Sequence, residues 1–247
     1  MPYNPAELRL EKIEVGTGYD AAFMFWNLRG VIAERWGHGP YFGSMGELGT
    51  QQVNLSPGPE EDDKRCTAVY GLKEAGFLAE GPKWTEPAWD LAPKWLADVH
   101  EVLKPRRTVR VTSQCFAIYP VDNPEQVSRR LRGHFYRNDH LRASLPNELA
   151  KKHQDRFHAA IDWLVLEGTA RTSLVAGVVG PPHQGTFFTF SDEERDQRWW
   201  MGFNLVMGDV NAGNGIERPV SRARDMLAKA REYSAHAAST VMAELLR

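Results

Sequence analysis

The order of apolar and polar residues predicts a chain that contains both strands and helices. Strands are expected where every second residue is apolar, or where β-branched and aromatic residues dominate. These runs are Leu8–Val15, Gln51–Leu55, Thr108–Tyr119, Phe157–Val165, Leu174–Val179, Thr186–Phe190 and Trp199–Val210. Short turns that contain Gly or Pro separate several of the later runs. This spacing is typical of hairpins, so we expect antiparallel pairing.

Four segments carry helical signals. The predicted helices are Asp20–Trp36, Glu86–Leu103, a helix opened by Asn123-Pro124-Glu125, and Glu217 to the end of the chain. The third is indicated by Pro124, because proline is favoured at the first helical position. The last is the clearest, because apolar or small residues recur at steps of three and four, as on one face of an amphipathic helix. They are Val220, Ala223, Leu227, Ala230, Ser234, Ala237, Val241 and Leu245.

These elements predict an α+β protein. We expect a mainly antiparallel sheet of roughly five to seven strands, with helices on one face and a long amphipathic C-terminal helix. The chain divides into an N-terminal α/β region, residues 1–104, and an antiparallel α+β region with the closing helix, residues 105–247. No flexible linker marks residue 104, so one continuous domain is the alternative.

Composition places the chain among ordinary globular proteins. Two cysteines, Cys66 and Cys115, lie far apart, and none of the eight histidines is four residues from another, so we expect no metal site. The first residues lack the pattern of a signal peptide, and no run approaches the roughly 18 apolar residues of a membrane span. We therefore expect a cytoplasmic protein that does not contact a membrane.

Charge is distributed unevenly along the chain. Residues 104–156 hold 12 Lys/Arg and 5 Asp/Glu, a balance of +7 in a chain of net charge −2, which leaves −9 for the rest. Such a segment fits an acidic protein or a phosphate backbone. The arginines expected to make this contact are on or just after the helix that starts at Pro124: Arg129, Arg130, Arg132, Arg137 and Arg142. A solvated helix face with local ion pairs is the plainer interpretation.

A glycine-containing turn offers a different hypothesis. Gly16-Thr17-Gly18 follows a predicted strand and precedes a predicted helix, which is the outline of a nucleotide-binding turn. It also resembles the first motif of the S-adenosylmethionine-dependent methyltransferases, which implies cofactor contacts by Glu14, Gly16, Gly18 and Asp20. The third glycine of the nucleotide motif is missing, and no acidic residue closes a second strand. An ordinary strand-to-helix turn is the alternative.

The later part of the chain resembles a sporadically distributed family of bacterial proteins of about this length. The resemblance covers residues 85–247 and is carried by the arrangement of its elements. The matching features are Trp89 and Trp95 in one helix, the strand Arg107–Tyr119, the helix start Asp122-Asn123-Pro124-Glu125, the strand Gly202–Val210, and His236 in the last helix. The resemblance implies no catalytic residues. Its patchy distribution implies, at most, mobile-gene contexts such as defence against phage.

No nucleophile, base and metal-ligand set stands at a catalytic spacing in this sequence. We therefore expect a non-enzymatic binding or scaffold subunit of a bacterial complex, without a cofactor. It would use the basic helix and the aromatic-rich helix Ala21–Trp36, in which Phe23, Phe25 and Trp26 widen the apolar stripe. The partner expected is an acidic protein, and a homo-oligomer is compatible. A nucleotide- or S-adenosylmethionine-dependent enzyme and a nucleic-acid-binding protein are the alternatives.

Overall fold

The computed structural model describes residues 3–37, 39–42, 45–57, 64–135, 160–181 and 187–246. Within these residues the strands are β1 (Arg9–Tyr19), β2 (Met45–Leu48), β3 (Gln52–Leu55), β4 (Cys66–Gly71), β5 (Glu74–Glu80), β6 (Thr108–Pro120), β7 (Ala160–Glu167), β8 (Ala170–Val179) and β9 (Trp200–Val210). The helices are the 3₁₀ turn η1 (Pro5–Glu7), α1 (Phe25–Gly37), α2 (Pro82–Leu103), α3 (Pro124–Phe135), α7 (Glu193–Asp196) and α8 (Pro219–Leu246).

All nine described strands form one antiparallel sheet, in the order β2-β3-β4-β5-β1-β6-β9-β8-β7. The prediction of an α+β protein with a mainly antiparallel sheet is confirmed. The two longest partners in the centre, β1 and β6, pair from Arg9 opposite Ile118 to Tyr19 opposite Thr108. Strands from both sides of residue 104 therefore share one sheet.

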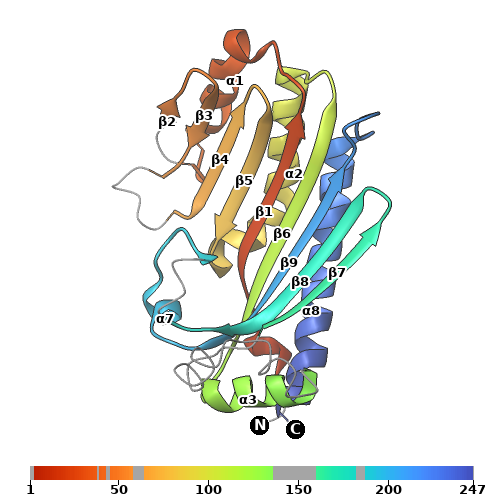
Figure 1. Cartoon of the computed structure of the whole chain (residues 1–247). Coiled ribbons are helices and arrows are strands. Elements are labelled where there is room, and N and C mark those ends of the chain that lie inside the picture. Colours follow the sequence, from red (N-terminus) through yellow and green to blue (C-terminus); the bar gives the residue numbers. More distant parts are fainter. Residues whose placement is uncertain are drawn as a thin grey trace, which may run out of the picture.

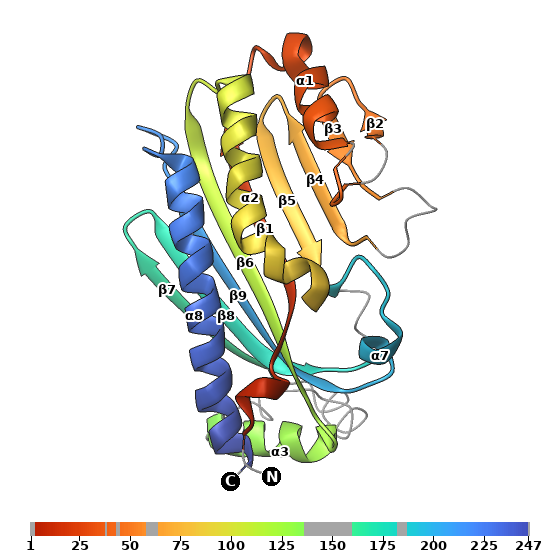
Figure 2. The same cartoon turned by 180° about the vertical axis from the view of Figure 1, so that it is seen from behind.

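The two long helices α2 and α8 lie on the same face of the sheet (Figure 2). The expected stripe of α8 is the face that packs on the strands: Ala223, Leu227, Ala230, Ser234, Val241 and Leu245 are buried. Small residues in this stripe let the helix approach the sheet closely. The first helix, α1, lies at one end of the molecule, whereas α3 and both chain ends lie at the other (Figure 1).

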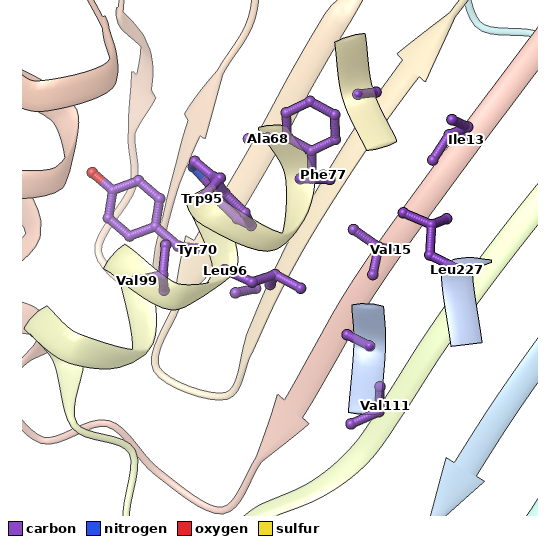
Figure 3. Close-up of a cluster of buried hydrophobic side chains, with 14 of the residues drawn as sticks. Ile13, Val15, Ala68, Tyr70, Phe77, Trp95, Leu96, Val99, Val111 and Leu227 are labelled. Atoms are coloured by element: carbon purple, nitrogen blue, oxygen red, sulfur yellow. The ribbon is translucent and has the colours of Figure 1, made fainter. Parts of the chain in front are cut away.

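The main core lies between the helices and the sheet. Trp95 and Leu96 from α2 pack over Phe77 of β5, and Leu227 of α8 approaches Val15 of β1 (Figure 3). Every second residue of β1 from Ile13 onward faces this core, which is the alternation that a half-buried strand requires. Burial of these apolar side chains is the dominant stabilising contribution.

The opposite face of the sheet is covered near α7. Phe116 of β6 lies on this face and contacts the rings of Phe187 and Phe188, with centroids 5.4 and 5.2 Å away. Further along the same face the side chains are polar, and the Gln114 amide donates to Asn204 over 2.8 Å. One end of the second face is therefore apolar and closed, and the middle is polar.

Buried charges fasten the α7 segment to the sheet. The carboxylate of Glu80 is fully buried and accepts hydrogen bonds from the backbone amides of Thr189 and Phe190 at 2.8–2.9 Å. Arg195 is also buried, lies 3.8 Å over the Phe188 ring and is 3.6 Å from the carboxylate of Glu11. Burial raises the pKa of Glu11, and the neighbouring arginines oppose this rise. This network has a structural role.

Several predicted boundaries differ from the structure. The helix predicted from Asp20 begins at Phe25, and the helix predicted from Glu86 begins one turn earlier, at Pro82. The third helix starts at Pro124, as predicted, with the Asn123 side chain accepting from the amide of Gln126 over 2.9 Å. The strand predicted over Thr186–Phe190 is wrong where it can be judged, because residues 188–190 are not in a strand.

Candidate docking surface

Three loops meet at the end of the molecule that carries α1. They connect β1 to α1, β4 to β5, and α2 to β6 (Figure 1). Their backbones are joined by hydrogen bonds from the amides of Tyr19 and Ala22 to the carbonyls of Lys73 and Leu72, at 2.8 and 2.9 Å. The Arg106 amide donates to the Ala21 carbonyl over 3.2 Å. These bonds fix the position from which α1 starts.

Buried polar side chains form hydrogen bonds near these loops. The Tyr19 hydroxyl donates to the carbonyls of Gly71 and Glu74, at 2.7 and 2.9 Å, and burial raises the pKa of this hydroxyl. The ring of His100 on α2 is hydrogen-bonded to the Thr17 hydroxyl over 3.0 Å. Burial lowers the pKa of His100 to about 4, so its ring is neutral at physiological pH. The Tyr19 hydroxyl thus holds the turn between β4 and β5, and the His100 ring joins α2 to β1.

The first residues of α1 and its approach expose an unusual amount of apolar surface. Phe23 is 69% exposed, Met24 41% and Trp26 54%, and we call these three residues the α1 apolar cluster. Phe25, between them, is buried and its ring lies 6.4 Å from that of Tyr70. Because the buried ring of Phe25 anchors this segment to the core, the exposed side chains beside it have a defined position. A group of exposed large apolar side chains marks an interaction surface more often than a single one does.

The Trp26 side chain is also held in place. Its indole N–H donates to the carbonyl of Thr50 over 3.1 Å, and Arg29, one turn later, donates to the carbonyl of Gly49 over 3.0 Å. The ring of Trp26 therefore has a defined position although it faces solvent. A pre-positioned aromatic ring loses little conformational entropy when a partner binds.

Exposed cations lie on the loops that are hydrogen-bonded to the segment before α1. Lys73, Lys104 and Arg106 come from the loops that bond to residues 19–22, and we call them the basic rim. None of the three forms an ion pair with another described residue. By contrast, the neighbouring Arg107 is paired with Asp20 at 2.6 Å. Among the described residues of these three loops, the cations without an ion pair are thus those of the basic rim.

Of the five arginines predicted to bind a partner, the three that the structure describes lie on α3 at the opposite end of the molecule and do not share one free face. Arg129 is exposed, but Arg130 donates to the carbonyl of Leu245 over 2.6 Å and Arg132 to the carbonyl of Ser128 over 3.3 Å. Arg130 thus satisfies an end carbonyl of α8 and complements the negative end of its dipole. Arg137 and Arg142 lie outside the described residues.

The predicted turn at Gly16-Thr17-Gly18 is wrong. These residues are in the middle of the sheet, where β1 continues to Tyr19 between β5 and β6. No helix begins directly after Gly18, because the chain stays in β1 to Tyr19 and α1 begins only at Phe25. The glycines therefore have no helix N-terminus beside them that could bind a phosphate. Their small size serves packing instead, because a Cβ at Gly18 would lie 3.2 Å from the Arg110 side chain. Glu14 is exposed on the sheet, and Asp20 pairs with Arg107.

Both cysteines are buried. Burial raises the pKa of both cysteine thiols, Cys66 and Cys115, to about 12, which keeps them protonated. Among the described residues no group of three or more His, Cys, Asp or Glu side chains is placed to hold a metal ion. Nor is any described helix long and apolar enough to cross a bilayer.

Two shallow hollows lie on the helix side. One, of about 450 Å³, is between α3 and the end of α8 and is lined in part by Tyr119 and Arg130. The other, of about 380 Å³, is between α2 and α8 and is lined in part by Cys115 and Arg231. The α1 end, with its exposed rings and free cations, is the better candidate site.

Comparison with protein-family models and with curated proteins found no match to this sequence. The candidate surface is therefore argued from its own geometry. The sequence pattern indicated part of it, since the excess of aromatic residues in the first helix was visible. The basic rim was not recognised as part of the site, because its residues come from loops far apart in sequence. Only the fold places Lys73 and Arg106 next to the same turn of chain.

Proposed function

We propose that this protein is a non-enzymatic binding subunit that docks a protein partner on the α1 apolar cluster and its basic rim. The single observation that carries the proposal is the exposure of Phe23, Met24 and Trp26 on a base held by backbone hydrogen bonds. Aromatic residues are enriched among the residues that dominate binding energy at protein interfaces. A cytoplasmic location and a role in a bacterial complex, such as one in phage defence, belong to the same proposal.

The chemistry of the surface defines the partner. Exposed rings fit an apolar patch, and Lys73, Lys104 and Arg106 favour carboxylates around it. We therefore expect an acidic protein segment with apolar side chains, which the positive potential steers into place. Arg129, the exposed arginine of the predicted basic helix, lies on α3 at the far end of the molecule and is not part of this docking surface.

A photo-crosslinking experiment in the native host tests this proposal. The photoreactive amino acid p-benzoylphenylalanine is placed at position 23, and in a matched control at Tyr233, which is exposed on α8. The proposal predicts a discrete adduct from position 23 that is absent from position 233. The adduct should weaken when Lys104 and Arg106 are both changed to Glu. Equal adducts at the two positions would contradict the docking surface.

The purified protein can also be tested for two other kinds of ligand, nucleic acid and lipid. If the basic residues bind nucleic acid, retention of the purified protein on an RNA or DNA column should fall steeply with salt concentration. If the exposed rings insert into lipid, the protein should co-sediment with anionic vesicles, and this should require Phe23 and Trp26. If no protein adduct forms at position 23, either of these results would contradict docking of a protein partner and would favour nucleic acid or lipid as the ligand.

A further inference from the structure

The far edge of the sheet is formed by an apolar strand, β7. It pairs with β8 over all eight residues, from Ala160 opposite Gly177 to Glu167 opposite Ala170. Within the described part of the chain no strand pairs with its other side. The strand lies beyond the layer made by α2 and α8 (Figure 2). Its outer edge therefore presents backbone N–H and C=O groups that can extend the sheet.

Apolar side chains are exposed on both faces of this edge. Leu164 is 51% exposed and Leu166 68% on one face, while Val165 is 53% exposed on the other. Ile161, which shares the face of Val165, is buried in the core beneath α8. The helix thus covers only the beginning of β7. Neither Lys nor Pro interrupts the strand, although such residues commonly protect natural edge strands from pairing.

Three charges near this edge, on Asp162, Glu167 and Arg171, lack an ionic partner among the described residues, and those of Asp162 and Arg171 are on the same face of the sheet. Arg171 of β8 is exposed opposite Leu166, and Asp162 of β7 is exposed opposite Val175. The Asp162 carboxylate accepts a long hydrogen bond, 3.4 Å, from the Ser173 hydroxyl. Four residues separate the Asp162 and Leu166 positions along one strand, about 13 Å, which is too far for Asp162 to pair with Arg171 in the same chain.

A second copy of the chain would supply both missing contacts. An antiparallel β7–β7 pair related by a two-fold axis at Leu164 puts Leu164 opposite Leu164 of the second copy and Leu166 opposite the copy's Asp162. That Asp162 is then two strands from Arg171, about 10 Å between backbones, within reach of the long arginine side chain. The symmetry forms this ion pair twice. In this register the edge pairs its exposed Leu164 with the copy's Leu164 and is complementary to itself in charge.

We propose that β7 is the interface of a homodimer, in which two nine-stranded sheets join through antiparallel β7 strands centred on Leu164. This goes beyond the docking of a partner on the α1 end. The dimer would leave both α1 apolar clusters accessible, because β7 and α1 belong to different parts of the molecule (Figure 1). The protein would then present two copies of its docking surface.

Light scattering coupled to size-exclusion chromatography of the full chain tests the assembly. We expect a particle of twice the chain mass of 27.9 kDa at micromolar concentration. Changing Leu164 and Leu166 together to Lys should give a monomer with an unchanged circular dichroism spectrum. The matched control Tyr233→Lys, another exposed apolar residue, should remain dimeric. A monomeric wild type, or a dimer that survives L164K/L166K, would overturn the proposal.

Cysteine crosslinking tests the register even if the lysine variant fails to fold. The native cysteines are buried, so a single Leu164→Cys change introduces one accessible thiol per chain. At the two-fold axis the two new thiols face each other, and mild oxidation should give a covalent dimer. Leu166→Cys, which faces Asp162 in this register, should crosslink far less. Equal crosslinking of both variants, or none of Leu164→Cys, would rule out this register.

Discussion

The backbone amide of Arg106 donates to the carbonyl oxygen of Ala21, although 85 positions separate the two residues in the chain. This bond brings the loop after α2 against the loop before α1. It therefore places the backbone of Arg106, whose exposed side chain forms no ion pair with a described residue, beside Ala21, two positions before Phe23 in the chain. The combination of rigid backbone, apolar surface and unpaired charge is the basis of the proposed docking surface.

The buried carboxylate of Glu80 gives a prediction about stability. Glu80→Gln replaces a charged acceptor of the Thr189 and Phe190 amides with a neutral group whose N–H₂ can face those donors. We expect a loss of about 2–3 kcal/mol in the free energy of unfolding, since hydrogen bonds to a buried charge are the strong ones. Urea unfolding measures this loss. Glu14→Gln, an exposed residue of the neighbouring strand, is the control and should change little.

His100 predicts a pH dependence. Its pKa is lowered to about 4 in the folded state, whereas an unfolded chain has a His pKa near 6.5. The unfolded state therefore binds the proton first, and stability falls as the pH drops from about 6.5 to 4, by as much as about 3 kcal/mol. His100→Gln keeps a hydrogen-bonding group beside Thr17 but does not titrate.

The measurement for His100 is the difference between wild type and His100→Gln at each pH. This difference matters because Glu11, whose pKa is raised, contributes in the opposite sense: its protonated form is favoured by folding, so its effect lowers stability as the pH rises above its unfolded value. The wild type should lose more stability on acidification than His100→Gln does. Parallel curves would show that His100 is not the responsible group.

Two glycines of β9 form a matched pair. A Cβ at Gly202 would lie 2.9 Å from side-chain carbons of Phe116 and Val179, whereas a Cβ at Gly208 would lie 4.0 Å from its nearest neighbour, the Val111 carbonyl oxygen. Gly202→Ala should cost about 1–3 kcal/mol through overpacking, and Gly208→Ala should be close to neutral. Thermal unfolding of both variants measures the difference. Equal effects would mean that the aromatic cover on this face is less tightly packed.

Arg129 and Arg130 are neighbours with different expected effects. Arg130→Ala removes the donor to the Leu245 carbonyl, so we expect a loss of about 1–2 kcal/mol in the free energy of unfolding. Arg129→Ala should have little effect on stability, because its side chain is exposed. Denaturant unfolding of the two variants tests this. A similar loss from both would contradict the assignment of Arg130 to the end of α8.

The sequence predicted the elements whose signals are local. The buried stripe of α8 can be predicted because apolar residues recur at steps of three and four over many turns of the helix. The helix start at Asn123–Pro124 can be predicted because capping involves adjacent residues. The extension of β1 through Gly16-Thr17-Gly18 was not predictable in this way. Glycine normally weakens a strand, and here its presence is explained by the neighbouring strands, including Arg110, which are contributed from elsewhere in the chain.

The docking surface could be predicted only in part, again because only its local features can be recognised in the sequence. The aromatic excess near Phe23 is a local property, and its exposure follows from which side of α1 meets the sheet. The sequence does not determine the role of Arg130, because an arginine on a helix can bind a partner or a nearby carbonyl. Its contact with Leu245 depends on two helices that lie 115 positions apart. Charge counted along the sequence does not show which cations are free.

The most direct test of the central claim measures the affinity of the partner that crosslinks at position 23. Biolayer interferometry would compare wild type, the double variant Phe23→Ser/Trp26→Ser, and Arg129→Glu at the far end. We predict a loss of affinity of about tenfold or more for the double variant and little change for Arg129→Glu. Undiminished binding by the double variant, or a larger loss with Arg129→Glu, would contradict the account.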